Sequence, residues 1–447
     1  MKNKLWQKSY DLNQDIEQFT VGDDRKMDLY LAPYDVLGSL AHIRMLSKVG
    51  LLEEEERQAL AKSLSQIYQR AIDGDFAIED GIEDVHSQVE MLLTQELGDV
   101  GKKIHSGRSR NDQVLVDLRL FFRAEIETLS QSTLQLFETL QSLSEEHKDI
   151  LMPGYTHLQV AMVSSFGLWF GAYAESLVDD MQQLLATYKI MNHNPLGSAA
   201  GYGSSFPLDR KLTTELLGFE DLNYNVVHAQ MGRGKTELFL AFALAAIGHT
   251  LNKLAMDIVL FMNQNFGFIR FPDELTTGSS IMPHKKNPDV FELIRAKCNQ
   301  LIALPGQVSM LTTNLPSGYH RDFQLLKEGL FPALQLANES LAMATFALQN
   351  IKVNKEVLDT HPMYKYLFSV EVVNREVLSG TPFRDAYQKI GEDIDSGNFD
   401  PDREVHHTHE GSIGNLCTAE IKAKMDRVVE AFPFTKVEEK INALLQG

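Results

Sequence analysis

The sequence predicts an all-α protein built around a central bundle of long helices. Apolar residues recur every three or four positions over 115–140, which keeps one face of a helix apolar along its length. Alternating patterns typical of strands are scarce, and the best strand candidate is the short stretch 225–228. The 447 residues favour about three compact units over one small binding module. Long antiparallel helices pack as a bundle, so we expect one in the largest unit.

Five segments carry the pattern of long helices: 115–140, 160–191, 235–265, 290–312 and 325–349, the last interrupted by Pro332. The wholly apolar run 238–247 is shorter than the roughly 18 residues of a membrane span and indicates a helix buried on all sides. Changes in turn chemistry and charge divide the chain into three parts. We expect an N-terminal helical domain (1–106), a central long-helix bundle domain (107–352) and a C-terminal helical domain (353–447).

The composition excludes several classes of protein. With 42 Lys and Arg against 61 Asp and Glu, the net charge of −19 is opposite to that of a nucleic-acid-binding protein. Cys298 and Cys417 are far apart, which argues against a disulfide framework and a thiolate zinc site. The basic stretch 1–8 is not followed by an apolar segment, so we expect no secretory signal. A cytoplasmic protein with neither nucleic-acid nor membrane partners is expected.

Because the protein is acidic overall, any anion must be bound by a local basic cluster. Five basic side chains occur between 102 and 110 without an acid among them. They belong to the first of four polar, glycine-bearing segments, 104–113, which precedes a long helix. Its arginines, serines and Asn111 can bind a carboxylate together with backbone N–H groups at the helix start. A helix cap with solvated arginines is the alternative.

The second and third polar segments carry candidate catalytic groups. His157, in the segment 153–159, can act as a general acid, although a lone histidine is more often structural. The segment 277–288 cannot continue a helix through Pro283 and holds two serines, two lysines and an asparagine. Such a set can remove a proton and stabilise the negative charge that develops beside it. A flexible lysine-rich turn is the alternative.

The fourth segment, 317–327, repeats polar residues at helical intervals, as either a recognition stripe or an ordinary amphipathic helix start. Two further segments are weaker candidates. The stretch 229–236 ends like a phosphate-binding P-loop but lacks the first glycine and the βαβ context. The histidines of 406–410 do not have the spacing of a metal site, so a surface loop is expected there.

Together the four segments resemble the fumarase/aspartase superfamily. Residues 278–287 match its loop GSSxMPxKxN without a gap. Residues 107–113, 154–159 and 319–327 match GRSRNDQ, GYTHLQ and YxRDxQxxK, which are typical of the argininosuccinate lyases within it. The resemblance implies three all-α domains and a homotetramer with a 20-helix core. It also implies active sites shared by three subunits, with neither a metal nor an organic cofactor.

The reaction implied by the resemblance is the reversible β-elimination of argininosuccinate to L-arginine and fumarate, as in arginine biosynthesis and the urea cycle. Adenylosuccinate lyase or another fumarate-releasing lyase is the alternative among enzymes. A crystallin-like structural protein is the alternative outside them, because the superfamily includes lens crystallins.

The resemblance also assigns roles to residues of this chain. Ser279 matches the catalytic base, His157 the proton donor, and Glu292 the carboxylate that pairs with this histidine, while Lys285 meets the developing charge. We assign no contacts to 20–25, and Lys253 stands where the family has a substrate-binding arginine. The positions expected to bind substrate are His86, Arg110, Asn111, Thr156, Ser280, Asn287, Tyr319, Arg321, Gln324 and Lys327.

Overall fold

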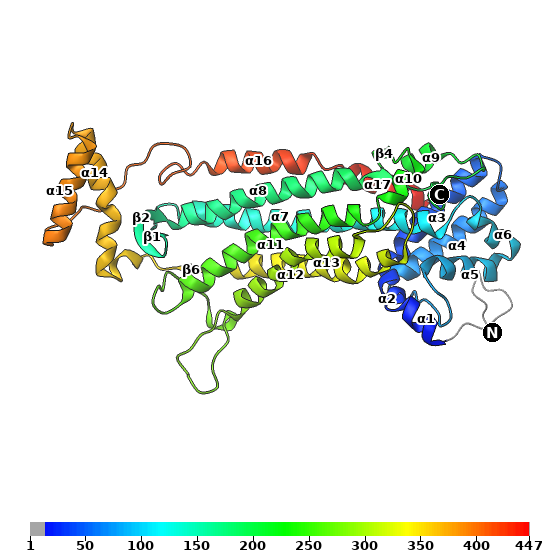
Figure 1. Ribbon diagram of the computed structural model, residues 1–447, viewed down its shortest axis with the longest axis horizontal. Coiled ribbons are helices and arrows are strands. Elements are labelled where there is room, and N and C mark those ends of the chain that lie inside the picture. Colours follow the sequence, from blue (N-terminus) through cyan, green and yellow to red (C-terminus); the bar gives the residue numbers. More distant parts are fainter. Residues whose placement is uncertain (1–13, 447) are drawn as a thin grey trace.

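The computed structural model describes residues 14–446 and shows an elongated helical molecule (Figure 1). The stretch 1–8, considered above for a secretory signal, lies outside the described residues. A bundle of long helices forms the middle, a cluster of shorter helices lies at one end, and the pair α14 and α15 lies at the other. The all-α class predicted from apolar spacing is confirmed.

Five long helices form the bundle, and they agree with four of the five predicted segments. The longest has 37 residues, and at 1.5 Å rise per residue it is about 55 Å long. Pro332 lies inside the last of them without ending it. The five are α7 (Arg110–Glu146), α8 (Phe166–Met191), α11 (Lys235–Met262), α12 (Asp289–Thr312) and α13 (Leu325–Leu348). A sixth helix, α16 (Thr418–Glu430), packs along α8.

The remaining elements lie mostly at the two ends of the bundle. At the end that holds the first described residues are α1 (Gln14–Val21), α2 (Asp24–Asp28), α3 (Ala32–Lys48), α4 (Glu54–Ile72), α5 (Val85–Leu97), α6 (Asp99–Lys102), α9 (Arg210–Leu216), α10 (Val226–Met231) and α17 (Phe434–Gln446). At the opposite end are α14 (Ser369–Leu378) and α15 (Phe383–Ser396). Short 3-10 helices cover Leu29–Leu31, Lys103–His105, Asp273–Leu275, Arg321–Gln324, Val357–Asp359 and Pro362–Phe368.

Three small two-stranded sheets complete the described fold. The largest is an antiparallel hairpin of β1 (Leu151–Thr156) and β2 (Gln159–Ser165). The other two are two-residue pairs: β3 (His193–Asn194) with β4 (Asp221–Leu222), parallel, and β5 (Ile269–Arg270) with β6 (Lys352–Val353), antiparallel.

Two local expectations were wrong. The stretch 225–228 is not a strand, because the Asn225 side chain accepts hydrogen bonds from the N–H groups of Val227 and His228 and so caps α10. The helix expected from residue 160 begins at Phe166, because 159–165 pairs with β1 instead. Ser165 then caps α8 by accepting a hydrogen bond from the N–H of Leu168.

Most of the apolar run 238–247 is buried, as predicted, although Phe242 is 50% exposed in the single chain. The run belongs to α11, which packs against α8, α12 and α13. By length and composition α11 could cross a membrane, yet 61% of its apolar window is buried within the protein. Gly248 allows α11 to approach α12 closely, because a Cβ atom there would lie 3.1 Å from the Leu301 Cβ and 3.2 Å from the Cys298 carbonyl oxygen. Burial of this helix therefore organises the bundle.

We predict that Leu244→Ala in α11 lowers the free energy of unfolding by about 2–5 kcal/mol, because a fully buried side chain is replaced by a cavity. Thermal and urea unfolding followed by circular dichroism measure the effect. Leu378→Ala removes the same atoms from a side chain that is 86% exposed and serves as the control. Equal unfolding midpoints for the two variants would contradict the prediction.

Candidate active site

A pocket of about 150 Å³ lies where the first turns of α7 and α13 meet α2 and the start of α5. It brings together seven predicted substrate-binding residues from distant parts of the chain: His86, Arg110, Asn111, Tyr319, Arg321, Gln324 and Lys327. The other residues that line it are Asp24, Asp28, Glu83, Asp84, Val114 and Arg233.

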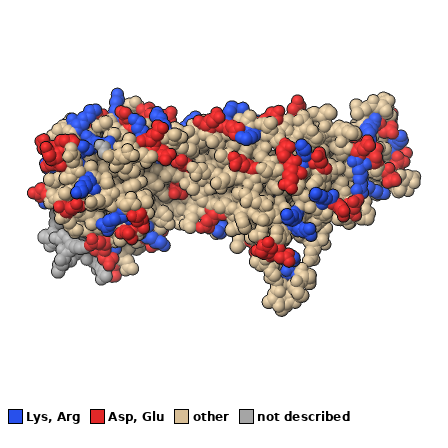
Figure 2. Space-filling view, turned by 180° about the vertical axis from the view of Figure 1, so that it is seen from behind, with Lys and Arg blue, Asp and Glu red and all other residues tan. Residues whose placement is uncertain are grey.

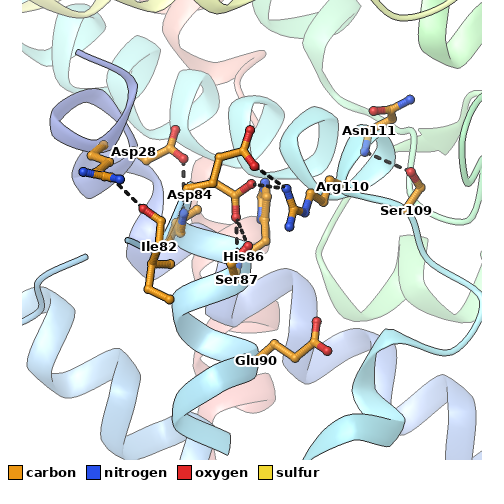
Figure 3. A network of polar contacts seen from close by, with 12 residues as sticks. Asp28, Ile82, Asp84, His86, Ser87, Glu90, Ser109, Arg110 and Asn111 are labelled. Carbon is orange, nitrogen blue, oxygen red and sulfur yellow. Dashed lines mark hydrogen bonds and ion pairs between the residues drawn. The ribbon is translucent and has the colours of Figure 1, made fainter. Parts of the chain in front are cut away.

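The start of α7 serves both as a helix cap and as a wall of the pocket. Ser109 caps the helix, and its N–H donates to Asp112 Oδ1 at 2.8 Å. The next side chain, Arg110, faces the pocket, with Nη1 3.2 Å from Glu83 Oε2 and 3.1 Å from Asp84 Oδ2 (Figure 3). The two alternatives for this segment, a helix cap and an anion-binding segment, are therefore compatible.

Of the basic cluster between 102 and 110, only Arg110 lines the pocket. Arg108 is buried and donates a hydrogen bond to Ser39 Oγ at 2.9 Å. The other three have partners elsewhere: Lys102 forms an ion pair with Asp99, Lys103 forms one with Glu56, and His105 Nδ1 lies 3.4 Å from Glu90 Oε2. These five side chains are close in sequence, but the structure does not place them all where they could bind the same anion.

The segment before α13 supplies the opposite wall. Arg321 donates to Glu83 Oε1 at 3.0 Å and to the carbonyl oxygen of Thr20, at the end of α1. Gln324 Nε2 donates to the carbonyl oxygen of Val21 at 2.9 Å. Lys327 Nζ lies 2.6 Å from Asp28 Oδ1 and also forms an ion pair with Asp24. The expected polar stripe is present, although it runs over a 3-10 turn before α13 begins.

Acidic side chains in the pocket were not predicted. Asp24, Asp28, Glu83 and Asp84 pair with the basic groups described above, so the pocket carries charges of both signs. Burial raises the pKa of Asp24 to about 6, with Asp28 adding to the effect and Lys327 opposing it. Basic groups bind carboxylates, whereas acidic groups bind ammonium and guanidinium groups. This pocket is therefore suited to a ligand that carries both.

Arg233 was also missed, because its segment was considered only as a P-loop. It lies between α10 and α11, with Nε 2.7 Å from Glu237 Oε1 and Nη2 donating to the carbonyl oxygen of Phe323 at 2.9 Å. Gly234, at φ 81°, caps α11 in a left-handed conformation that favours glycine. The segment that resembles a phosphate-binding loop is therefore a helix start, and it adds an arginine to the pocket.

His86 is buried, and two carboxylates contact it from below the pocket. Its Nδ1 lies 2.7 Å from Asp35 Oδ1 and 3.5 Å from Asp117 Oδ2. Burial lowers the pKa of His86, but the hydrogen bond and charge of Asp35, with the charges of Asp117 and Asp84, raise it to about 9. Asp35 and Asp117 were not singled out in the sequence, where each is one acid within a helix.

Thr156 and His157 lie elsewhere, at the exposed tip of the β1–β2 hairpin. His157 and Leu158 form its two-residue turn with φ of 54° and 57°, a conformation that glycine or asparagine usually occupies. Gly154 is required in β1, because a Cβ atom there would lie 2.6 Å from the Met162 carbonyl oxygen. Both residues of this turn therefore hold a backbone conformation that costs free energy for side chains other than glycine.

The segment 277–288 is a loop that projects from the side of the bundle (Figure 1). Its base is closed by Asn287, whose N–H donates to the Thr277 carbonyl oxygen at 2.9 Å. Ser279 Oγ accepts hydrogen bonds from the N–H groups of Ile281 at 3.3 Å and Met282 at 3.1 Å. Ser280 and Lys285 are exposed, and Glu292 is exposed in the first turn of α12.

Within one chain, the candidate residues therefore occupy three separate places. The pocket lies at one end of the bundle, the hairpin tip lies at the other, and the loop projects from its side. Within residues 14–446, no hydrogen bond or ion pair joins His157 to Glu292 or Ser279 to Lys285. One chain alone does not gather the base, the acid and the substrate-binding groups around one point.

Comparison with known proteins assigns the chain to a family. The sequence model of a family described as "Lyase" matches residues 12–303. A protein of Bacteroides fragilis named argininosuccinate lyase is 62% identical over 445 residues, which cover 100% of this chain and 99% of that protein.

Solved structures show the same fold at low sequence identity. EDDS lyase in complex with formate has a TM-score of 0.75 at 21% identity, covering 98% of this chain and 95% of that one. Class II fumarase of Schistosoma mansoni has a TM-score of 0.70 at 16% identity, covering 93% and 95%. Because an argininosuccinate lyase is 62% identical over the full length of this chain and the lyase family model also matches, the chain belongs to the argininosuccinate lyase family, within the superfamily that its four polar segments indicated.

Proposed function

We propose that this protein is an argininosuccinate lyase, which converts argininosuccinate reversibly to L-arginine and fumarate in arginine biosynthesis. The observation that carries the proposal is the mixed-charge pocket: Arg110, Arg321 and Lys327 face four acidic side chains. The substrate carries three carboxylates, an α-ammonium and a guanidinium group. Each charge on such a ligand can replace one partner of an existing ion pair, so the ligand leaves few buried charges unpaired.

The difficult step is removal of a proton from the carbon next to a carboxylate, because the product is an aci-carboxylate with two negative charges. Ser279 is the proposed base. Its Oγ already accepts two backbone N–H groups, so an alkoxide formed there would be stabilised at once. Lys285 and Asn287, on the same loop, meet the charge of the aci-carboxylate, which lowers the barrier because the charge develops in the transition state.

The carbon–nitrogen bond then breaks, with its electron pair leaving on the guanidinium nitrogen. His157 is the proposed donor of the proton that this nitrogen takes up, and Glu292 the carboxylate that keeps the histidine charged and oriented. One proton leaves carbon and one reaches nitrogen, so the elimination is balanced without an oxidant or reductant. His86, Arg110, Asn111, Thr156, Ser280, Tyr319, Arg321, Gln324 and Lys327 bind the substrate in this proposal.

A homotetramer would bring the three separated places together, with each site drawing on three subunits. Exposed apolar side chains on the bundle support such an assembly, and Figure 2 shows wide uncharged stretches along its middle. These side chains are Phe242 and Met256 of α11, Leu293 and Met310 of α12, and Met343 and Phe346 of α13. We further propose a cytoplasmic location and the three domains 1–106, 107–352 and 353–447.

We predict that the purified protein releases fumarate from argininosuccinate, which ultraviolet absorbance of fumarate measures directly. Adenylosuccinate, offered under the same conditions, is the control substrate. Turnover of adenylosuccinate without turnover of argininosuccinate would contradict the proposed substrate, and turnover of neither would favour a structural protein.

Ser279→Ala should lower kcat at least about a hundredfold, because proton transfer by a positioned group typically contributes 10²- to 10⁴-fold. The same fumarate assay measures kcat. Ser396→Ala, at the exposed end of α15, is the matched control and should leave kcat unchanged. Near-normal turnover by Ser279→Ala would show that another group is the base.

Mixing two inactive variants tests the shared site. His157→Ala and Lys285→Ala should each be inactive alone and regain part of the activity when their subunits are dissociated, mixed and reassembled, because some sites then receive both intact segments. Size-exclusion chromatography should show four copies of the 50.4 kDa chain. Absence of any recovery in correctly assembled mixed tetramers would argue against sites shared between subunits.

A further inference from the structure

Three helices bring a histidine and two carboxylates together beneath the pocket. Asp35 lies on α3, His86 on α5 and Asp117 on α7, and all three are buried. One oxygen of each aspartate and one nitrogen of the histidine lie within 4.8 Å of one another. Elements far apart in sequence thus converge on one imidazole ring.

The two carboxylates determine which nitrogen of the His86 ring faces them. Nδ1 is turned to Asp35 and Asp117, at 2.7 and 3.5 Å, which leaves Nε2 for the pocket that His86 lines. Hydrogen bonds from the described residues do not reach either oxygen of Asp117 or the Oδ2 atom of Asp35. Buried carboxylates without hydrogen bonds are costly, so their place beside the ring needs an explanation.

The charges near the ring account for these carboxylates. Burial and the charge of Asp35 raise the pKa of Asp117, whereas the positive charges of His86 and Arg108 lower it. The charges of Asp35 and Asp117 in turn raise the pKa of His86, so both carboxylates favour the positively charged ring. The titratable and charged groups around the cluster are Asp28, Asp35, Asp84, Glu90, His105, Arg108, Arg110 and Asp117.

We propose that Asp35 and Asp117 are positioning residues that orient the His86 ring and keep it positively charged, so that Nε2–H binds a carboxylate of a dicarboxylate ligand. The inference rests on the proposed function, because it assigns to His86 one carboxylate of the succinyl part of the substrate. Neither aspartate reaches the ligand itself, since both lie behind the ring.

A metal ion is the other occupant that these three side chains could hold. It would need a free lone pair on Nδ1, but in the charged ring Nδ1 carries a proton and donates it as a hydrogen bond to Asp35 Oδ1 at 2.7 Å. The buried guanidinium of Arg108 already interacts electrostatically with both aspartates. A divalent cation at the same place would therefore meet positive charge as well as the two carboxylates.

The pH dependence of succinate binding tests the inference without turnover, because succinate is a dianion at alkaline pH and does not react. In the unaltered protein the affinity, measured by calorimetry, should persist to pH 8 and fall as pH rises through about 9, where His86 loses its proton. In Asp35→Asn the fall should begin at least about one pH unit lower, which corresponds to about twofold weaker binding at pH 8 and to nearly tenfold weaker binding at pH 10. Asp117→Asn should shift it in the same direction by less.

Kinetics give a second readout. In Asp35→Asn the KM for argininosuccinate should rise more than kcat falls, and the alkaline limb of kcat/KM should move with that of succinate binding. Asp99→Asn, which removes an exposed carboxylate of α6, is the matched control and should leave both profiles unchanged.

Several results would overturn the inference. One is an unchanged alkaline limb in folded Asp35→Asn and Asp117→Asn. Should either variant fail to fold, the unaltered protein decides, because a loss of succinate affinity near pH 6.5 would show an ordinary histidine. Stoichiometric metal in the purified protein that disappears in Asp117→Asn would also contradict it. Failure of the proposed function is a separate outcome, seen as no fumarate from the unaltered protein at any pH.

Discussion

Packing of α11 inside the bundle is the constraint on which the rest of the structure depends. Its buried side chains hold α8, α12 and α13 around it, and the candidate site residues outside α5 and α7 lie at the ends of these helices or in the turns beside them. A rigid helix fixes the distance between its two ends. The pocket, the hairpin and the loop are thus held apart within one chain, and the same rigidity would align them between chains.

The pairing of opposite charges is a second constraint, and it applies to the side chains of the pocket. Isolated buried charges are costly, and here Arg110, Arg321 and Lys327 each have an acidic partner supplied by another segment. This explains how a protein with a net charge of −19 can contain a site for a polycarboxylate. The net charge describes the exterior, whereas binding depends on a few pairs whose partners a ligand can replace.

The sequence predicted the features that depend on local pattern. Apolar spacing identified the long helices, two of the four polar segments supplied six predicted residues that meet in the pocket, and the family resemblance supplied the seventh, His86. It did not predict the hairpin, because 160–191 has enough apolar residues to resemble one continuous helix and the pairing with β1 is a tertiary property. Asp35 and Asp117 were missed for a related reason. A single acid on a helix resembles a solvated side chain until neighbouring helices bury it beside His86.

The two-residue turn at His157 also has a consequence for how this chain can vary. A turn of two residues cannot take up an added residue or give one up. The side chains of a strand also alternate between its two faces. An insertion or deletion of a single residue between Tyr155 and Val160, where the pairing next to the turn is regular, would turn the imidazole to the opposite face of the hairpin or displace it along the ladder. Away from Gly154 and His157, substitutions in this stretch can accumulate as long as its length is kept. We therefore expect natural variants to differ here in composition, while an alignment of their sequences shows no gap.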